Sequence, residues 1–128
     1  MQDPPHPPVM LAAAATFLRT PVPPEAAPHM AFIGRVAANG MELCARELTL
    51  GPQYDAEELE RLRALVGEDG TLLELNNRLC EKIRSGELTL QTPGVKDHLW
   101  AITLAKLSID QPNYAGYKAA LAERGHKA

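Results

Sequence analysis

The residue types that perform chemistry in proteins occur in this chain without the spacing that such chemistry requires. His98 follows Asp97 directly, and adjacent helix residues do not face each other, so we expect a surface histidine rather than a proton-transfer pair. Cys44 falls deep in a predicted helix, away from the helix N-terminus that would activate a thiolate, and we expect a core residue. The sequence contains no glycine-rich phosphate loop, HExxH pair, paired CxxC or nucleophile elbow. We therefore expect this chain alone to have no enzymatic activity, no metal and no cofactor.

Polar residues interrupt the apolar faces of three predicted helices. Lys106 lies in the middle of one apolar arc, Asn76 is centred on the stripe of a second helix, and Glu47 lies within the stripe of a third. Residues flanking these positions, or one turn away, complete a set of candidates for a binding site or a buried polar network. The candidates are Arg35, Asn39, Glu47, Asn76, Lys106 and Asp110.

A buried polar group without a hydrogen-bond partner costs about 1–3 kcal/mol, so several of these side chains are expected to meet. The topology decides which. In an up-and-down bundle Lys106 lies near Arg35 and Asn39, whereas a short helix that crosses the bundle brings Lys106 towards Glu47. Three interpretations stay open: a structural network that fixes helix register, a pocket around Lys106 that binds an anionic small molecule, and an error in the helix phase.

The helices that must position these residues follow from apolar periodicity and from start and stop signals. Gly51 and Pro52 are expected to end one helix, Asp55 and Glu58 to cap the next, and Gly86 to end the one after that. The segment between residues 87 and 91 is too isolated for a strand, so we expect a loop. The predicted helices cover about residues 9–19, 27–48, 55–66, 71–85, 93–109 and 113–124.

Two of these helices carry informative apolar patterns. In helix 27–48, Phe32, Val36 and Leu43 fall on one line, with Ile33, Gly40 and Cys44 beside it, and this apolar side is expected to pack inward. Helix 93–109, which starts at the Thr92–Pro93 pair, has two apolar arcs and is therefore expected to be packed on both sides as the central element. Its second arc is the candidate interaction face if the bundle leaves it uncovered. That face consists of Trp100, Leu104 and Leu107.

Composition and charge limit the classes of function. The chain has 128 residues, 45% of them hydrophobic and 23% charged, as in ordinary globular domains. A net charge of −3 and an aromatic content of 5% argue against a nucleic-acid partner. No apolar run is long enough to cross a bilayer, so we expect a cytoplasmic protein. We predict an all-α fold, a compact bundle of about five short helices over residues 9–125, with a proline-rich connector and disordered tails at 1–8 and 126–128.

Three segments together resemble a family of short, uncharacterised bacterial α-helical proteins. They are AFIGRVAAN (31–39), ARELTLGP (45–52) and AKLSIDQPNY (105–114). The resemblance runs from about Leu11 to Tyr117, and the proline-rich region 21–28 departs from the more continuous helical connection of the family. Members are encoded beside, or fused to, aminoglycoside-phosphotransferase-like kinases and sometimes near acyl-CoA dehydrogenases.

The resemblance transfers no activity, because the family has none established. It implies instead an accessory or protein-interaction domain that works with a phosphotransferase-like kinase or an enzyme of acyl-CoA metabolism. The expected partner is therefore a protein, either that enzyme or a second copy of the chain.

Overall fold

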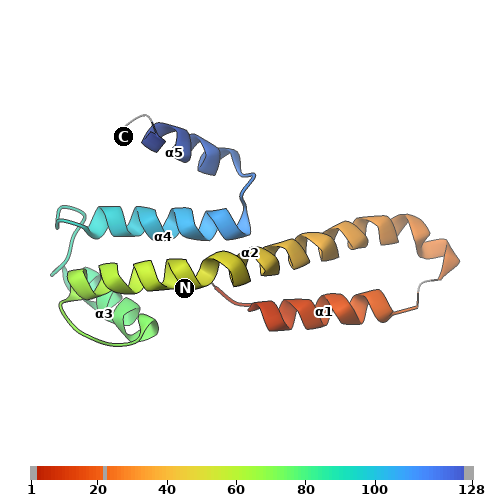
Figure 1. The fold of residues 1–128 in the computed structure, drawn as a ribbon, viewed down its shortest axis with the longest axis horizontal. Helices are drawn as coiled ribbons and strands as arrows, with labels where there is room; N and C mark the ends of the chain where they lie inside the picture. The colour runs from red at the N-terminus through yellow and green to blue at the C-terminus, as the bar shows by residue number, and fades with distance from the viewer. Residues whose placement is uncertain (1–2, 22, 126–128) are drawn as a thin grey trace. The chain divides into compact units, whose positions relative to one another are not determined.

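The computed structural model describes residues 3–21 and 23–125, and every regular element in them is a helix. The elements are α1 (Pro7–Arg19), the short 3-10 helix η1 (Pro24–Ala26), α2 (Ala27–Val66), α3 (Leu72–Ser85), α4 (Val95–Asp110) and α5 (Ala115–Gly125) (Figure 1). The all-α fold class is confirmed, and the segment 87–91 is a loop as expected. The tail predicted at 126–128 lies outside the described residues, as do residues 1 and 2 of the predicted N-terminal tail.

Contacts divide the chain into two compact units, and the boundary falls inside α2, between Leu50 and Gly51. The N-terminal unit contains α1, η1 and the first part of α2. The C-terminal unit contains the second part of α2 with α3, α4 and α5. The single domain expected over residues 9–125 stays a prediction.

α2 is one continuous helix of 40 residues where the sequence predicts two. The expectation that Gly51 and Pro52 end a helix and that Asp55 begins another is wrong. A glycine ends a helix when it adopts a left-handed conformation, and Gly51 does not. Gly67 does, with φ of 76°, directly after the last residue of α2. Pro52 removes one backbone donor, but the helical turns on either side continue through it.

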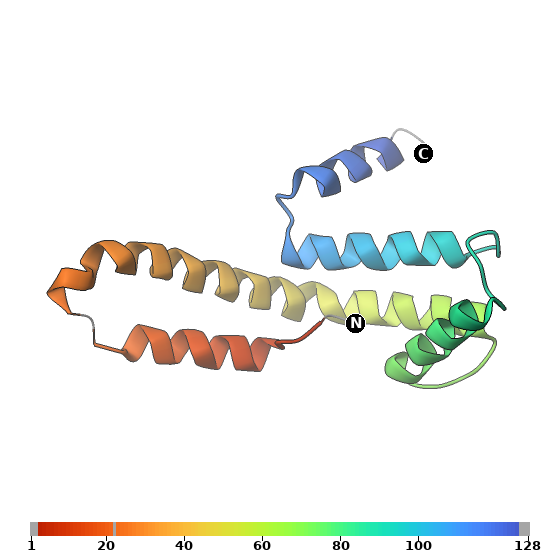
Figure 2. The same ribbon diagram turned by 180° about the vertical axis from the view of Figure 1, so that it is seen from behind.

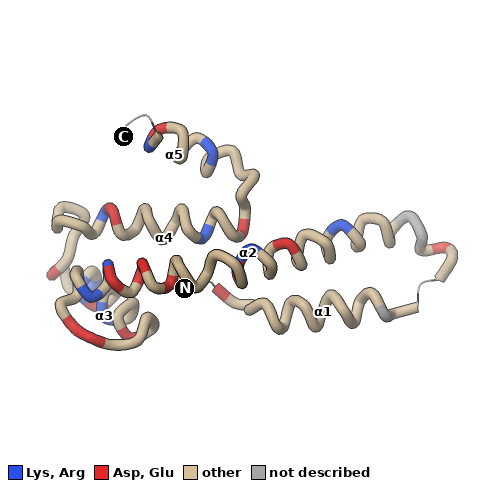
Figure 3. The backbone as a smooth tube through the Cα atoms, in the orientation of Figure 1, with Lys and Arg blue, Asp and Glu red and all other residues tan. Residues whose placement is uncertain are grey.

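In the N-terminal unit, α1 lies alongside the first part of α2 (Figures 1 and 2). Small residues on α2 make this close approach possible. A Cβ atom added at Gly40 would lie 3.8 Å from Cε of Met10, and the buried Cys44 donates a hydrogen bond of 3.7 Å from its Sγ to the carbonyl of Pro7. Figure 3 shows few charged residues along α1, which fits a helix held by apolar contacts.

The predicted apolar side of helix 27–48 is buried only in part: Cys44 is buried and Leu43 is half-buried. Phe32 is 56% exposed and Val36 is 53% exposed. α1 instead packs on the side of Gly40 and Cys44, and Cys44 lies about 120° round the helix from Phe32. The small residues at this point let the two helix backbones approach closely. The bulky side chains of Phe32 and Val36 face solvent instead.

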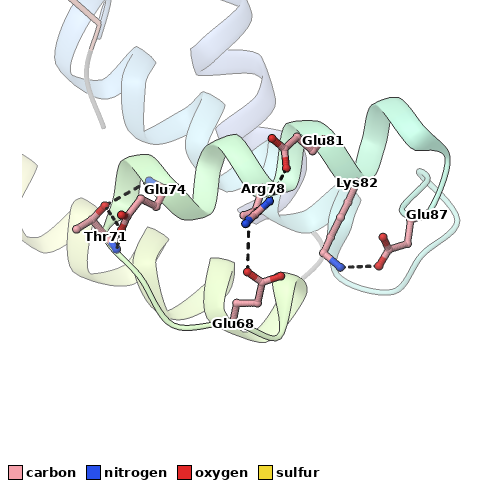
Figure 4. A network of polar contacts seen from close by, with 7 residues as sticks. All are labelled: Glu68, Thr71, Glu74, Arg78, Glu81, Lys82 and Glu87. Carbon is pink, nitrogen blue, oxygen red and sulfur yellow. Dashed lines mark hydrogen bonds and ion pairs between the residues drawn. The ribbon is translucent and has the colours of Figure 1, made fainter.

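The core of the C-terminal unit joins the end of α2 to α3. Its buried residues are Leu62, Val66, Leu75 and Leu79, with Leu59, Leu72 and Leu88 packed against them. α3 begins at a capping box in which the hydroxyl of Thr71 accepts from the backbone of Glu74, and the Glu74 carboxylate accepts from the backbone of Thr71 (Figure 4). It ends at Gly86, with φ of 81°, as the sequence predicts. Local signals therefore define both ends of α3.

α4 begins two residues later than predicted. Thr92 does not cap it: its Oγ1 accepts a 3.0 Å hydrogen bond from the backbone of Thr89 and so closes a turn in the preceding loop. Gly94, in a left-handed conformation with φ of 86°, is the residue before the first turn. Figures 1 and 2 show α4 between the second part of α2 and α5, as expected for a helix with two apolar arcs.

Candidate functional site

Four polar side chains from three helices form a cluster inside the C-terminal unit. Glu58 and Arg61 come from α2, Asn76 from α3 and His98 from α4. Asn76 donates a 2.7 Å hydrogen bond from Nδ2 to Oε1 of Glu58 and a second, of 3.1 Å, to the carbonyl of Leu72. Glu58 and His98 are the buried members, and we call the four residues the buried polar cluster.

The expectation that His98 is a surface residue is wrong, because the side chain is only 1% exposed. His98 follows the buried Val95 by three residues and precedes the buried Ile109 by eleven, which places all three on one face of α4. Among the described residues, neither ring nitrogen of His98 has a hydrogen-bond partner, and neither does Nε of Arg61. The cluster is thus only partly satisfied by hydrogen bonds.

The cluster controls the protonation of two groups. Burial lowers the pKa of His98, the nearby Arg61 guanidinium lowers it further, and the Glu58 carboxylate acts in the opposite direction. Burial alone would raise the pKa of Glu58, but hydrogen bonds to its carboxylate, including the one from Asn76, bring the pKa below its ordinary value. At neutral pH the cluster therefore holds a carboxylate beside an uncharged imidazole.

This arrangement can take up a proton at His98. The cluster contains no serine, threonine, cysteine or lysine side chain. Across residues 3–21 and 23–125, no group of three or more His, Cys, Asp or Glu side chains could hold a metal ion. The Asn76–Glu58 hydrogen bond joins α2 to α3, and the buried His98 of α4 makes no hydrogen bond to them among the described residues.

The six residues predicted from the sequence are divided between the two units. Arg35, Asn39 and Glu47 belong to the N-terminal unit, and Asn76, Lys106 and Asp110 belong to the C-terminal unit. Arg35, Asn39 and Asp110 are exposed, and the other three are half-buried. Asn76 meets Glu58, which is outside the predicted set. That several of the six meet one another stays a prediction.

The burial of Glu58 and His98 was not predicted, although the sequence contains a signal for each residue. Glu58 precedes Leu62 by four residues and Leu65 by seven, so it belongs to the apolar stripe of that helix. Its position three residues after Asp55 suggested a cap instead, and that interpretation failed together with the predicted helix start. His98 was assigned to the surface from its neighbour Asp97, although its spacing from Val95 indicates the inner face.

The predicted interaction face on α4 is partly covered. Trp100 is 42% exposed, whereas Leu104 and Leu107 are half-buried. Part of the cover comes from α5, whose Arg124 guanidinium carbon lies 5.7 Å from the centre of the Trp100 ring in a cation–π contact. Trp100 is therefore the member of this face that remains most available to a ligand or partner.

Ion pairs cover the outer surface of α3 (Figure 4). Arg78 pairs with Glu81 at 2.9 Å and with Glu68 at 3.5 Å, and Lys82 pairs with Glu87 at 2.5 Å. The carboxylates of Glu81 and Glu68 raise the pKa of the Arg78 guanidinium. Pairs at such exposed positions contribute little to stability, and we assign them no function.

Comparison with known proteins identifies a family but no role. The model of a family described as a domain of unknown function (DUF6285) matches residues 24–114, more than half of the chain. No curated protein and no solved structure matches the chain. The matched region includes all of α2, α3 and α4, and hence the whole buried polar cluster. Within the described residues, no helix has both the length and the apolar character needed to span a bilayer.

Proposed function

The chain belongs to the DUF6285 family, which has no assigned function, and we propose that it is a non-catalytic accessory domain that binds a protein partner through one face of α2. We call this surface the α2 face: Phe32 and Val36, with Arg35 and Asn39 beside them. The observation that carries the proposal is that Phe32 and Val36 are both more than half exposed, although they lie one helical turn apart.

Exposed apolar residues are informative when they are large and contiguous. Isolated ones are common on protein surfaces, whereas a contiguous patch marks a site of interaction. Phe32 and Val36 have the i, i+4 spacing by which one helix inserts anchors into the groove of a partner. The N-terminal unit adds further exposed large apolar residues on its two helices. These are Val9, Leu11, Leu18 and Leu48.

The partner that the sequence resemblance favours is a bacterial phosphotransferase-like kinase encoded beside this chain. The α2 face lies within the residues that the family model matches, as expected for a surface that members use in common. Arg35 adds a positive charge to the rim of the face, so its counterpart on the kinase would be an apolar groove with an acidic edge. An acyl-CoA-metabolising enzyme encoded nearby is the second partner to test.

Co-expression of the full chain with the neighbouring kinase tests this proposal. The purified complex should be lost when Phe32→Asp and Val36→Asp are combined, because the pair buries two charges at the centre of the contact. Leu73→Asp is the matched control, since Leu73 is 56% exposed on α3 and lies outside the α2 face. Circular dichroism of each variant checks that the helices form.

Three results would decide the matter. Loss of the complex in the double variant alone supports the proposal. Equal binding by wild type and double variant overturns it. A homodimer that the double variant dissolves, with no kinase bound, would replace the kinase by a second copy of the chain.

A further inference from the structure

A groove on the C-terminal unit runs between α4 and the loop that precedes it. Its volume is about 530 Å³, and it is lined by Leu90, Gln91, Lys96, Leu99, Trp100 and Thr103. Grooves and pockets of this volume accommodate small organic molecules. All six residues fall within the part of the chain that the family model matches. The groove is separate from the α2 face, so a function assigned to it goes beyond the proposed accessory role.

The apolar part of the groove exposes two large side chains. Leu90 is 63% exposed and Trp100 is 42% exposed. Leu99, which is half-buried, adds a further apolar contact. Because Arg124 lies over the ring of Trp100, the indole is held by a cation–π contact with α5. The groove therefore offers a supported aromatic surface beside an aliphatic one.

The polar part of the groove carries a positive charge. Lys96 is exposed and forms no ion pair or hydrogen bond with any described residue. The lining contains no carboxylate. Lys96 and Trp100 also line an adjacent cavity of about 260 Å³, and Asp97 and Glu123 lie around that cavity. Lys106, the cation at the centre of the predicted anion pocket, differs because it already has an interaction partner.

We propose that this groove binds a small organic carboxylate that carries an aromatic ring or a short aliphatic chain. The apolar part of the ligand packs against Trp100 and Leu90, and its carboxylate lies beside the Lys96 ammonium. The side-chain amide of Gln91 and the hydroxyl of Thr103 supply further polar contacts at the edge. A neutral ligand would leave the ammonium without a counter-charge, and a purely polar anion would leave the two apolar side chains in water.

Intrinsic fluorescence gives a direct test, because Trp100 is the single tryptophan of the chain. The full chain is titrated with 3-phenylpropionate at low ionic strength, where surface charge is least screened. We expect a saturable change in the emission of Trp100. The neutral analogue 3-phenylpropanamide should bind about fivefold more weakly, and acetate should produce no change.

Two pairs of variants assign the site. Lys96→Gln should raise the Kd for 3-phenylpropionate about fivefold and abolish its preference over the amide. Lys118→Gln, on an exposed lysine of α5 outside the groove, should leave both unchanged. Leu90→Ser should weaken the acid and the amide alike, whereas Leu73→Ser should affect neither.

The proposal is overturned if no saturable change occurs with 3-phenylpropionate, or if Lys96→Gln and Lys118→Gln bind it equally. It is also overturned if acid and amide bind with the same Kd, since the groove would then not recognise a carboxylate. None of these outcomes depends on the α2 face or on a kinase partner.

Discussion

At the scale of single residues, His98 and Glu58 are buried groups whose pKa values are lowered in the folded chain. His98 is buried, and both this burial and the nearby Arg61 guanidinium disfavour its charged form. Glu58 is also buried, but it keeps its charge because Asn76 and other donors stabilise the carboxylate. Protonation therefore places a charge on the buried His98, and it removes the charge of Glu58 that the hydrogen bonds stabilise. Both changes disfavour the folded state.

We expect the free energy of unfolding to fall as the pH is lowered from 7.5 to 5.5. The pKa of His98 is lowered in the folded state, so below its unfolded value of about 6.5 the unfolded chain binds the proton more readily. This contribution is fully present above that value and is lost as the pH falls towards the folded pKa. Glu58 shifts in the same direction, and its contribution is lost only below about pH 4.3.

Urea unfolding at pH 7.5, 6.5 and 5.5 measures this slope. The variant His98→Leu should flatten it over that range, while the exposed His29 remains as an internal control. Wild-type stability that rises or stays constant between pH 7.5 and 5.5 would contradict the account of His98.

Substitution of the adjacent residues Asn76 and Asn77 compares the loss of a hydrogen-bonded side chain with the loss of an exposed one. Asn76→Ala removes the hydrogen bond to Glu58 and leaves a buried carboxylate short of a donor, which should cost about 1–3 kcal/mol of unfolding free energy. Asn77→Ala changes an exposed residue and should cost less than about 0.5 kcal/mol. Chemical denaturation of both variants at pH 7.5 compares them. Equal losses would show that the Asn76–Glu58 bond does not stabilise the fold.

At the scale of elements, the sequence predicts what is set locally. The bounds of α3 follow from the Thr71–Glu74 box and from Gly86, and both signals act within one turn. The all-α class follows from apolar periodicity along the whole chain. The helix end predicted at Gly51 and Pro52 is wrong because a glycine–proline pair permits a helix end without requiring one. Here the helix continues to Val66.

The sides on which helices pack could not be read in the same way. Phe32 and Val36 lie on the predicted apolar side of that helix and are exposed, whereas α1 packs beside them at Gly40 and Cys44. Periodicity gives the position of an apolar stripe but not the shape of its neighbour. His98 and Glu58 were missed for a related reason, because local rules for pairs and caps suggested other roles.

The continuity of α2 through Pro52 leads to a prediction about stability. Pro52 has no backbone N–H and crowds the preceding turn, so Pro52→Ala should stabilise the chain by about 1–2 kcal/mol, after allowing for the greater freedom of the unfolded chain. Pro112→Ala, at a position between α4 and α5, should give no such gain. Thermal unfolding of both variants at pH 7.5 provides the comparison. Destabilisation by Pro52→Ala would mean that the helix depends on the local geometry that proline imposes.

At the scale of the whole molecule, the two units differ in how completely they bury their apolar residues. The C-terminal unit has a leucine core and a buried polar cluster in which a hydrogen bond joins α2 to α3. The N-terminal unit has Cys44 as its buried hydrophobic residue among the described positions, and six of its large apolar side chains are exposed. This contrast fits the proposal that the C-terminal unit provides most of the stability and that the N-terminal unit provides the surface for a partner.

Hydrogen–deuterium exchange of the full chain, with and without the proposed kinase partner, tests the α2 face most directly. The account predicts that amides within residues 29–43 exchange more slowly in the presence of the kinase, and that those of α3 do not change. A complex that protects α3 or α4 but leaves residues 29–43 unchanged would contradict the central claim, because the partner would then bind elsewhere on the molecule.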